Sequence, residues 1–250
     1  MLAIIGGTGL SKLKGFTQLG AESIATPYST DKIELLRFAS GEDEFMFLPR
    51  HGAEHQLPPH AINYRANIAA LSAAGASEVV AVNAVGAIHK DLHPGAFAVP
   101  DQIVDYSYSR EMTFCDGELK PVHHIDFSDP YSETIRQRIL KAAGTVNSQR
   151  ESICAVMPGG TYACTQGPRL ETAAEIRRLA NDGCDMVGMT GMPEAALARE
   201  LEIEYASLAL SVNWAAGLSA EPITLADIHA VLEGGMEFVG SVLAEVVRDS

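Results

Sequence analysis

This chain of 250 residues is 47% hydrophobic and 20% charged, the composition of an ordinary globular protein that can bury a sizeable core. Its formal net charge of −14 argues against nucleic acid as a partner, because phosphate backbones are bound by basic surfaces. A small anionic substrate remains compatible with that charge, since it needs only a few local donors. No apolar run approaches the roughly 18 residues of a membrane span, and the first residues lack the basic start of a signal peptide. We therefore expect a cytoplasmic protein without a membrane partner.

The first predicted element is a short buried strand over residues 2–5 that runs into a glycine-rich loop over residues 6–11. The loop lacks the dinucleotide-binding pattern, because Lys12 stands where the third glycine belongs, and no G-K-S or G-K-T follows as in the Walker pattern. What remains is a backbone loop with the hydroxyl of Thr8, which can cradle one small anion. A tight turn that requires glycine torsions is the open alternative.

Residues 34–38 and 44–48 flank a short polar segment and predict a β-hairpin. The loop that follows carries Arg50 and three histidines, which are His51, His55 and His60. Metal binding by these histidines is disfavoured, because prolines interrupt any helical spacing between them. An arginine beside a histidine after a strand better suits phosphate recognition, with a solvated polar loop as the alternative. The four cysteines form no C-x-x-C pair, so we expect reduced, structural thiols and no metal.

Strands and helices alternate through the rest of the chain. The sequence predicts helices over residues 61–74, 131–143 and 173–180, and strands over residues 78–85, 96–99, 103–106, 154–157 and 205–212. The strand at 78–85 ends among small residues that let a ligand approach the backbone closely. From Leu225 onward, apolar residues at spacings of three and four predict a long helix with one buried face. This order predicts an α/β fold in one domain over residues 1–250, with candidate site residues at strand ends.

A strand-to-helix turn is predicted at Thr190 and Gly191. Residues 186–189 form a short apolar run typical of a buried strand. Pro193 fits a first helical turn, and Glu194 is an acid of the kind that a helix N-terminus favours. Free N–H groups and the hydroxyl of Thr190 can meet an anion at such a turn. Taken by itself, this stretch favours an ordinary α/β turn with a structural threonine.

Taken together, these loops resemble the trimeric purine nucleoside phosphorylase family, and most closely its methylthioadenosine phosphorylase branch. The matching stretches follow the family's order across most of the chain: residues 6–10, Arg50-His51-Gly52 with His55, Pro59 and Asn63-Tyr64, residues 167–169, Met189-Thr190 with Pro193-Glu194, and the strand that ends at Asn213. Each motif is weak alone, but the ordered set is specific. The resemblance implies a mixed central sheet flanked by helices, and a homotrimer with active sites near the subunit interface. It also implies reversible cleavage of an N-glycosidic bond by orthophosphate as co-substrate, with no metal and no organic cofactor.

The resemblance also implies a role for each loop. It implies a phosphate site formed by Thr8, Arg50, His51, Thr190 and the backbone of Ala84. It implies that Leu170, Glu171 and Asn213 surround the base, with Asn213 donating to the leaving purine. It implies that Met189 packs on the ribose. Near the 5′ group it implies His124, lent by a neighbouring subunit, together with Leu225 and Ile228 of the last helix.

The expected base pocket departs from the methylthioadenosine branch. That branch has aspartates where Asn213 and Ala215 stand, and a serine where Glu171 stands. Glu171 and Asn213 instead resemble the inosine/guanosine branch, in which the glutamate accepts from N1–H of the base and the amide serves O6 and N7. A carboxylate facing the N1 lone pair of adenine would leave buried polar groups unmatched, which is costly. We therefore expect a 6-oxopurine base.

The expected 5′ pocket favours a thioether, because Leu225 and Ile228 are apolar where the inosine/guanosine branch has a histidine. His229 lies beside that helix face rather than on it. The expected reaction is phosphorolysis of methylthioinosine to hypoxanthine and 5-methylthioribose 1-phosphate. Phosphorylases of methylthioadenosine, or of inosine and guanosine, are alternatives within this class. A non-catalytic purine-binding protein and a nucleoside hydrolase that uses water are alternatives outside it.

Overall fold

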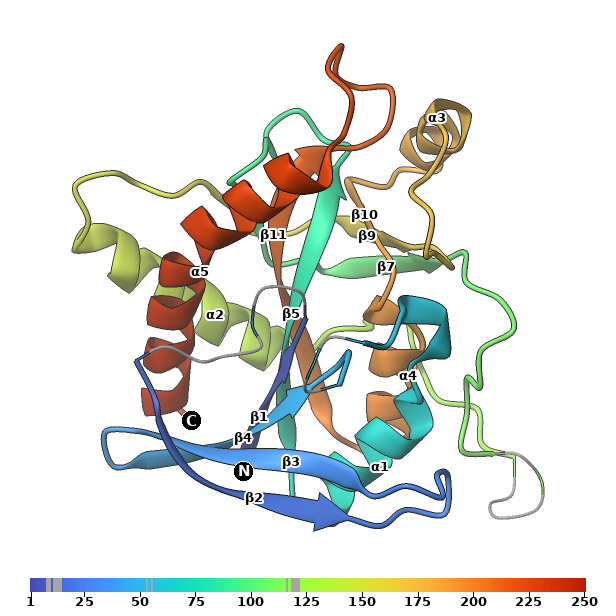
Figure 1. Cartoon of the computed structure of the whole chain (residues 1–250), viewed down its shortest axis with the longest axis vertical. Coiled ribbons are helices and arrows are strands. Elements are labelled where there is room, and N and C mark those ends of the chain that lie inside the picture. Colours follow the sequence, from blue (N-terminus) through green and yellow to red (C-terminus); the bar gives the residue numbers. More distant parts are fainter. Residues whose placement is uncertain (8–9, 11–14, 53, 55, 116, 118–121) are drawn as a thin grey trace.

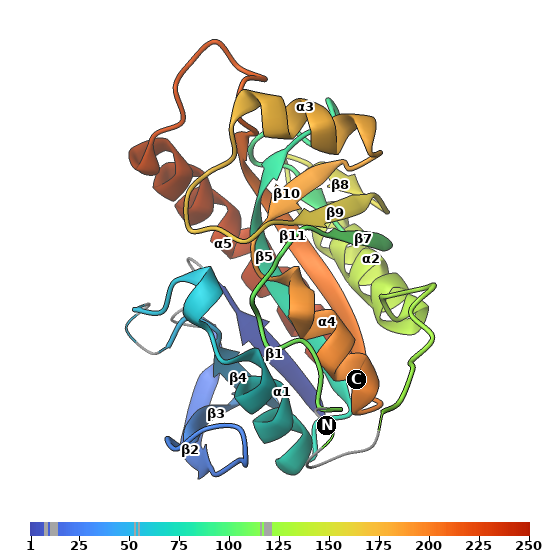
Figure 2. The same ribbon diagram turned by 90° about the vertical axis from the view of Figure 1, so that its right-hand side faces the viewer.

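The computed structural model describes residues 1–7, 10, 15–52, 54, 56–115, 117 and 122–250. The helices in these residues are the 3₁₀ helix η1 (Pro59–Ala61), α1 (Tyr64–Ala73), α2 (Glu133–Ser148), α3 (Ala173–Asn181), α4 (Gly191–Glu200) and α5 (Leu225–Arg248). Figure 1 and Figure 2 show α2 and α5 on one face of a central sheet and α1 and α4 on the other, with α3 near the top of both views. None of the described helices is long and apolar enough to span a membrane.

Eleven strands of the described residues form one mixed sheet. They are β1 (Leu2–Gly6), β2 (Thr17–Ile24), β3 (Ile33–Ser40), β4 (Asp43–Pro49), β5 (Glu78–Ala87), β6 (Phe97–Ala98), β7 (Gln102–Asp105), β8 (Val156–Met157), β9 (Thr161–Cys164), β10 (Met186–Gly188) and β11 (Glu204–Trp214). The main path runs β2-β3-β4-β1-β5-β10-β9-β7, and β11 pairs with β5 and β6. β1 is parallel to β4 and β5, and β11 is parallel to β5, whereas β10 is antiparallel to β5. The fold is therefore the α/β architecture with a mixed sheet that the sequence predicts.

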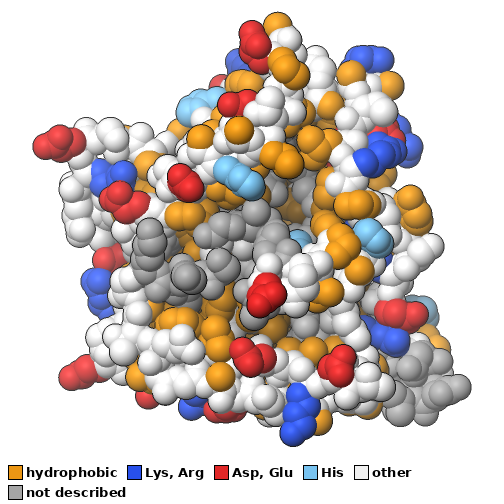
Figure 3. Space-filling view, in the orientation of Figure 1, with side chains coloured by type: hydrophobic (Ala, Val, Ile, Leu, Met, Phe, Trp, Pro, Cys, Tyr) orange, Lys and Arg blue, Asp and Glu red, His pale blue; other side chains and the backbone are white. Residues whose placement is uncertain are grey.

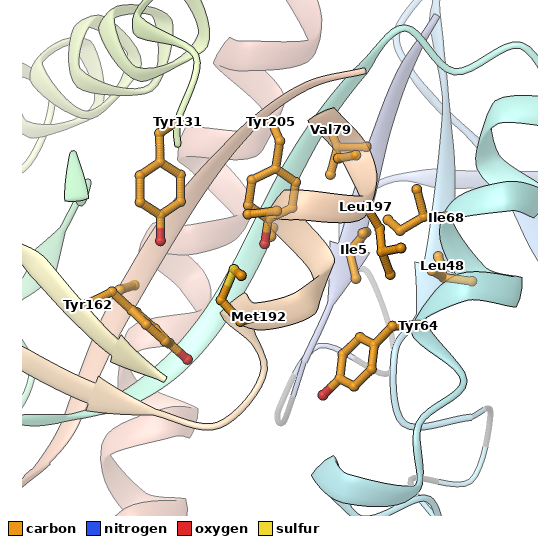
Figure 4. Close-up of a cluster of buried hydrophobic side chains, with 14 of the residues drawn as sticks. Ile5, Leu48, Tyr64, Ile68, Val79, Tyr131, Tyr162, Met192, Leu197 and Tyr205 are labelled. Atoms are coloured by element: carbon orange, nitrogen blue, oxygen red, sulfur yellow. The ribbon is translucent and has the colours of Figure 1, made fainter. Parts of the chain in front are cut away.

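The central strand β5 is buried on both faces, as expected of a strand covered by helices on each side. Its side chains alternate between two apolar clusters, because successive residues of a strand point to opposite faces. Val80 and Val82 belong to the cluster that includes residues of α2 and α5. Val79 belongs to the other cluster, where Ile68 of α1 and Leu197 of α4 meet it (Figure 4). The helices thus hold the sheet from both sides and fix the strand ends that carry the site.

Two strands, β2 and β9, are absent from the sequence-based prediction. Nearly every residue of β2 is exposed, because β2 lies at the edge of the sheet next to β3, so no apolar alternation marks it. β9 is only four residues long and follows a glycine pair directly. All the helices and strands that the sequence predicts are present. Their ends differ from the prediction by a few residues, which is the usual uncertainty of element boundaries.

The parallel strands bring several chain segments to one edge of the sheet. Gly7 follows β1, Arg50 follows β4, and Ala84 lies near the end of β5. In β11 the register shifts just before Asn213, which pairs with Gly86 of β5. Open α/β sheets bind ligands beyond the carboxyl ends of their strands. This edge is therefore the expected place for a ligand.

Candidate active site

A cavity of about 180 Å³ lies at this edge of the sheet. Figure 3 shows hydrophobic side chains gathered around a hollow on the face viewed in Figure 1. Nine of the residues that the sequence predicts for the site line the cavity: Arg50, His51, Ala84, Leu170, Glu171, Met189, Thr190, Asn213 and Ile228. The fold thus gathers them from six separate parts of the chain.

Arg50 is a buried cation in the wall of this cavity, with 1% of its surface exposed. Its Nε and Nη2 groups donate to the two carboxylate oxygens of Glu194, each at 2.8 Å, and Nη1 donates to the carbonyl of Val82 at 2.9 Å. A guanidinium carries five N–H groups. These three bonds therefore orient Arg50 without exhausting its donors.

Glu194 balances the charge of Arg50 and is itself held by Tyr205. The carboxylate is 1% exposed, and Oε1 accepts from the Tyr205 hydroxyl at 2.8 Å. Burial works against the charge of Arg50, but the adjacent Glu194 carboxylate outweighs it and raises the pKa of Arg50 above its usual value. The sequence pattern indicates only a favourable acid at a helix N-terminus. The partnership with Arg50, 144 residues away along the chain, appears only in the fold.

Thr190 lies at the start of α4, is 8% exposed, and does not cap the helix with its side chain. Its Oγ1 accepts from Nδ2 of Asn83 at 2.9 Å, and Oδ1 of Asn83 accepts from the hydroxyl of Ser207 at 2.7 Å. Because Oγ1 already accepts, its own proton can donate to a ligand in the cavity that Thr190 lines. Asn83 and Ser207 are not among the predicted site residues. The only sequence signal for Asn83 is a polar residue within an apolar strand.

His51 is the second predicted phosphate ligand after β4 and is 8% exposed. Its Nδ1 donates to the carbonyl of Leu57 at 2.8 Å, which fixes the orientation of the ring in the cavity wall. Ala84 contributes the end of β5 to the same wall. Thr8, predicted for the phosphate site, and His55, quoted in the family motif, lie outside the described residues.

The residues predicted around the base lie on the loop before α3 and at the end of β11. Oε1 of Glu171 accepts from the hydroxyl of Thr165 at 2.6 Å. Nδ2 of Asn213 donates to the backbone carbonyl of Trp214 at 2.7 Å, which uses one of the two amide protons. Leu170 lines the cavity but is 45% exposed. This end of the cavity therefore combines a carboxylate and an amide with an apolar rim.

Met189 is predicted to pack on the ribose. Its position also explains why residue 167 of the family motif is a glycine. Gly167 has a φ of 62°, in the left-handed region that favours glycine. A Cβ added there would stand 2.5 Å from Sδ of Met189. The backbone of the base loop thus lies directly against Met189, which joins the two segments of the site.

The 5′ end of the expected site differs in part from the prediction. Ile228 lines the cavity, whereas Leu225 is 72% exposed and is not among the lining residues. Ile223 and Leu232 line it instead. Leu232 follows Ile228 by one helical turn, so the sequence spacing points to it, but Ile223 precedes the helix and has no such signal. His124 is exposed and lies outside this cavity in the single chain.

Within the described part of the chain, no group of three or more His, Cys, Asp and Glu side chains is arranged to hold a metal ion. The four cysteines all lie in that part and are free thiols. Burial raises the pKa of the Cys164 thiol to about 12, so it is protonated near neutral pH and is a poor nucleophile. The polar chemistry of the cavity therefore rests on its arginine, histidine, hydroxyl, carboxylate and amide groups.

Comparisons over the whole chain agree with this geometry. A family model described as "Phosphorylase superfamily" matches residues 1–248. The chain is 53% identical over 248 residues to "Probable S-methyl-5'-thioinosine phosphorylase" of Pseudomonas syringae pv. tomato, covering 99% of this chain and 98% of that one. It is 41% identical over 251 residues to "6-oxopurine nucleoside phosphorylase" of Pyrococcus furiosus, covering 98% of this chain and 91% of that one.

A solved structure leads to the same family. Methylthioadenosine phosphorylase from Schistosoma mansoni, in complex with adenine, matches this fold with a TM-score of 0.91 at 31% identity, covering 99% of this chain and 90% of that chain. The match includes the sheet and the helices that carry the cavity. The family indicated by the ordered loop motifs is thus confirmed by sequence and by fold, and the chain belongs to the phosphorylase superfamily.

Proposed function

We propose that this protein is a phosphate-dependent purine nucleoside phosphorylase, a pentosyltransferase, that acts on S-methyl-5′-thioinosine and releases hypoxanthine and 5-methylthioribose 1-phosphate. The observation that carries the proposal is a single cavity that combines anion-binding groups, Arg50 and Thr190, with a base-binding pair, Glu171 and Asn213. Three relatives that carry the methylthioinosine phosphorylase name, at 53%, 44% and 43% identity, support the choice of substrate.

The phosphate end of the cavity has a positioning task, because phosphate arrives as an anion and needs no general base. In the proposed complex Arg50 and Thr190 donate to its oxygens, with Thr8, His51 and the backbone at Ala84 completing the set. The transition state of glycoside cleavage carries positive charge on the ribose, so the held anion also stabilises it electrostatically.

The base end accounts for the choice of purine. In the proposed complex the carboxylate of Glu171 accepts from N1–H, and the amide of Asn213 donates the proton that Trp214 does not use toward N7 or O6. The donation compensates the negative charge that develops on the leaving base. Adenine has an acceptor at N1 and an amino donor at position 6, so it mismatches both groups. Sites built on hydrogen bonds reject such analogues by as much as ~10⁴-fold.

The 5′ end supports a methylthio group, because Ile223, Ile228 and Leu232 give the cavity an apolar end. A 5′-hydroxyl would lose hydrogen bonds to water there without replacement. The alternative of inosine or guanosine as substrate is supported by the name of the Pyrococcus furiosus relative, and methylthioadenosine by that of the Schistosoma mansoni structure.

The remaining parts of the proposal rest on the sequence and on the family resemblance. The sequence supports a single domain and a cytoplasmic location. The resemblance supports the absence of a metal or organic cofactor, and a homotrimer in which His124 of a neighbouring subunit reaches the 5′ group. Exposed apolar side chains beside the cavity support the homotrimer, because a neighbour would cover them; they are Leu170 and Leu225.

The test is base release from methylthioinosine with and without orthophosphate, followed by chromatography of both products. We expect hypoxanthine and a sugar phosphate only when phosphate is present. Equal release without phosphate would indicate a hydrolase, and no release would indicate a binding protein. Comparing kcat/KM for methylthioinosine, inosine and methylthioadenosine then decides the substrate. A preference for methylthioadenosine would overturn the roles of Glu171 and Asn213.

A further inference from the structure

The carboxylate of Glu171 accepts a short hydrogen bond from Thr165, a residue that does not line the substrate cavity. The Thr165 hydroxyl donates to Oε1 of Glu171 at 2.6 Å, within the range of a charge-assisted O–H···O⁻ bond. Glu171 borders the substrate cavity and also a second hollow of about 340 Å³, whereas Thr165 lines only the second. Thr165 therefore reaches the substrate cavity only through Glu171.

The backbone of Thr165 is fixed on both sides, so its hydroxyl has little freedom to move away. Its N–H donates to the carbonyl of Gly188 at 2.8 Å, which extends the pairing of β9 with β10. Its carbonyl accepts from Nη2 of Arg110 at 3.1 Å, and the same nitrogen donates to the carbonyl of Gln166 at 2.9 Å. Arg110 thus clamps the turn from which the hydroxyl projects toward Glu171.

The hydroxyl has a second acceptor within reach, but that contact is weaker. The carbonyl of Gly188 lies 3.4 Å from Oγ1 of Thr165 and already accepts from the Thr165 N–H. A hydroxyl has one proton, so donation to Glu171 at 2.6 Å dominates. Oε1 of Glu171 is thereby occupied as an acceptor, and Oε2 is left to meet the base.

The bond between Thr165 and Glu171 affects which purine base can bind. A carboxylate whose first oxygen accepts a fixed hydroxyl proton presents its second oxygen as an acceptor, which matches a base with a proton on N1. To bind adenine, the carboxyl would have to carry a proton and donate it to N1. The hydroxyl of Thr165 opposes that arrangement, because its bond to Oε1 would change from a charge-assisted bond to a weaker one with the neutral carbonyl oxygen of a carboxylic acid.

We propose that Thr165 is a specificity-determining residue that acts through Glu171: its hydroxyl holds the carboxylate as an acceptor and so selects 6-oxopurines over 6-aminopurines. This inference rests on the proposed function, in which Glu171 binds N1–H. Thr165 is a positioning residue and does not touch the substrate. The Thr165–Glu171 pair, rather than the glutamate alone, then defines the base pocket.

The test compares Thr165→Val, which keeps the shape and removes the hydroxyl, with Thr165→Ser, which keeps the hydroxyl. Thr165→Val should lower kcat/KM for methylthioinosine about ten- to hundredfold, the loss of one hydrogen bond to a charged group. Most of the loss should appear in the nucleoside KM, with the phosphate KM unchanged. Efficiency with methylthioadenosine should not fall, so the ratio between the two nucleosides should shrink by the same factor. Thr165→Ser should restore the ratio to within about threefold of wild type.

Thr145→Val is the matched control, because Thr145 lies on α2 and donates its hydroxyl to the carbonyl of Lys141, away from the cavity. It should leave the ratio of kcat/KM between the two nucleosides and the phosphate KM unchanged. An unchanged nucleoside ratio in Thr165→Val would overturn the proposal, as would a Thr165→Ser variant as impaired as Thr165→Val. Equal losses for both nucleosides together with a raised phosphate KM would indicate general damage and also overturn it. If Thr165→Val does not fold, Thr165→Ala replaces it with the same expected ratio.

Wild-type kinetics separate this inference from the proposed function. If the wild-type protein does not prefer methylthioinosine to methylthioadenosine, the proposed function fails before any variant is compared. If wild type shows the preference and Thr165→Val keeps it, the proposed function stands and the role of Thr165 falls.

Discussion

The two ends of the cavity are held in different ways. At the phosphate end, Arg50, Thr190 and Glu194 are between 1% and 8% exposed and are joined to the core by buried hydrogen bonds. At the base and 5′ end, Leu170 is 45% exposed, and Glu171, Asn213 and Ile228 are only partly buried. The first end is thus part of the core of one chain, while the second lies at its rim. Changes at the phosphate end should therefore affect folding and phosphate binding together, and changes at the rim should alter selectivity with little effect on folding.

The largest effect is expected for Glu194→Ala, which leaves the guanidinium of Arg50 buried without its counter-ion. Removing one partner of a buried ion pair costs about 3–5 kcal/mol, so the free energy of unfolding in urea should fall by that amount. Asp249→Ala is the control, because it breaks an exposed pair with Lys141 that is worth at most about 1 kcal/mol. A similar, small loss in both variants would contradict the view that the phosphate end belongs to the core.

Arg50→Ala should raise the phosphate KM on the order of 100-fold, since it removes hydrogen bonds to a charged ligand. The nucleoside KM should change much less. Because the single variant leaves Glu194 as a buried anion, it should be compared with the double variant Arg50→Met/Glu194→Gln, which removes both charges. The double variant should recover much of the stability but not the phosphate affinity. An unchanged phosphate KM in both would remove Arg50 from the proposed site.

Local patterns predict most of the fold, and the family resemblance of the loops predicts many of the cavity residues, but neither predicts the contacts that hold those residues. The alternation of strands and helices is visible residue by residue, and the loop motifs mark Arg50 and Thr190. Their partners are distant in sequence: Glu194 is 144 residues from Arg50, and Asn83 is 107 residues from Thr190. No spacing rule connects such pairs, since segments far apart in the sequence bring them together only when the sheet forms. The exposed strand β2 escapes prediction for the opposite reason, because it has no buried face to mark it.

The 5′ end offers a matched pair of substitutions on one helix. Ile228→Ala should lower the preference for methylthioinosine over inosine about tenfold, because a smaller apolar contact discriminates less against a hydroxyl. Leu225→Ala, at the exposed start of α5, should change that preference by less than about twofold. The measurement is the ratio of kcat/KM for the two nucleosides. Equal effects of the two variants would instead place Leu225 against the substrate in the assembled protein, as the family resemblance implies.

The smallest effect is expected at the start of α3, where the base loop is closed by an exposed ion pair. The carboxylate of Glu175 accepts from both Nη groups of Arg169, at 2.8 and 2.7 Å, and from the backbone N–H of Thr172 at 2.7 Å. The bonds from Arg169, followed by that from Thr172, lower the pKa of Glu175 to about 2 from a usual value of 4.5. The folded-state pKa is depressed, so this contribution to stability is fully present above about pH 4.5 and is lost as the pH falls toward 2.

Glu175→Gln tests this contribution, because glutamine keeps a capping-box acceptor and removes the charge. The variant should melt slightly below wild type at pH 6, and the two melting temperatures should converge as the pH is lowered through 4.5 toward 2. Both carboxylate and guanidinium are exposed, so 1 M salt should shrink the difference at pH 6 as well. The same salt should leave the loss in Glu194→Ala almost unchanged, since that pair is buried. A difference between Glu175→Gln and wild type that is independent of pH and salt would mean that the rim is held by packing rather than by charge.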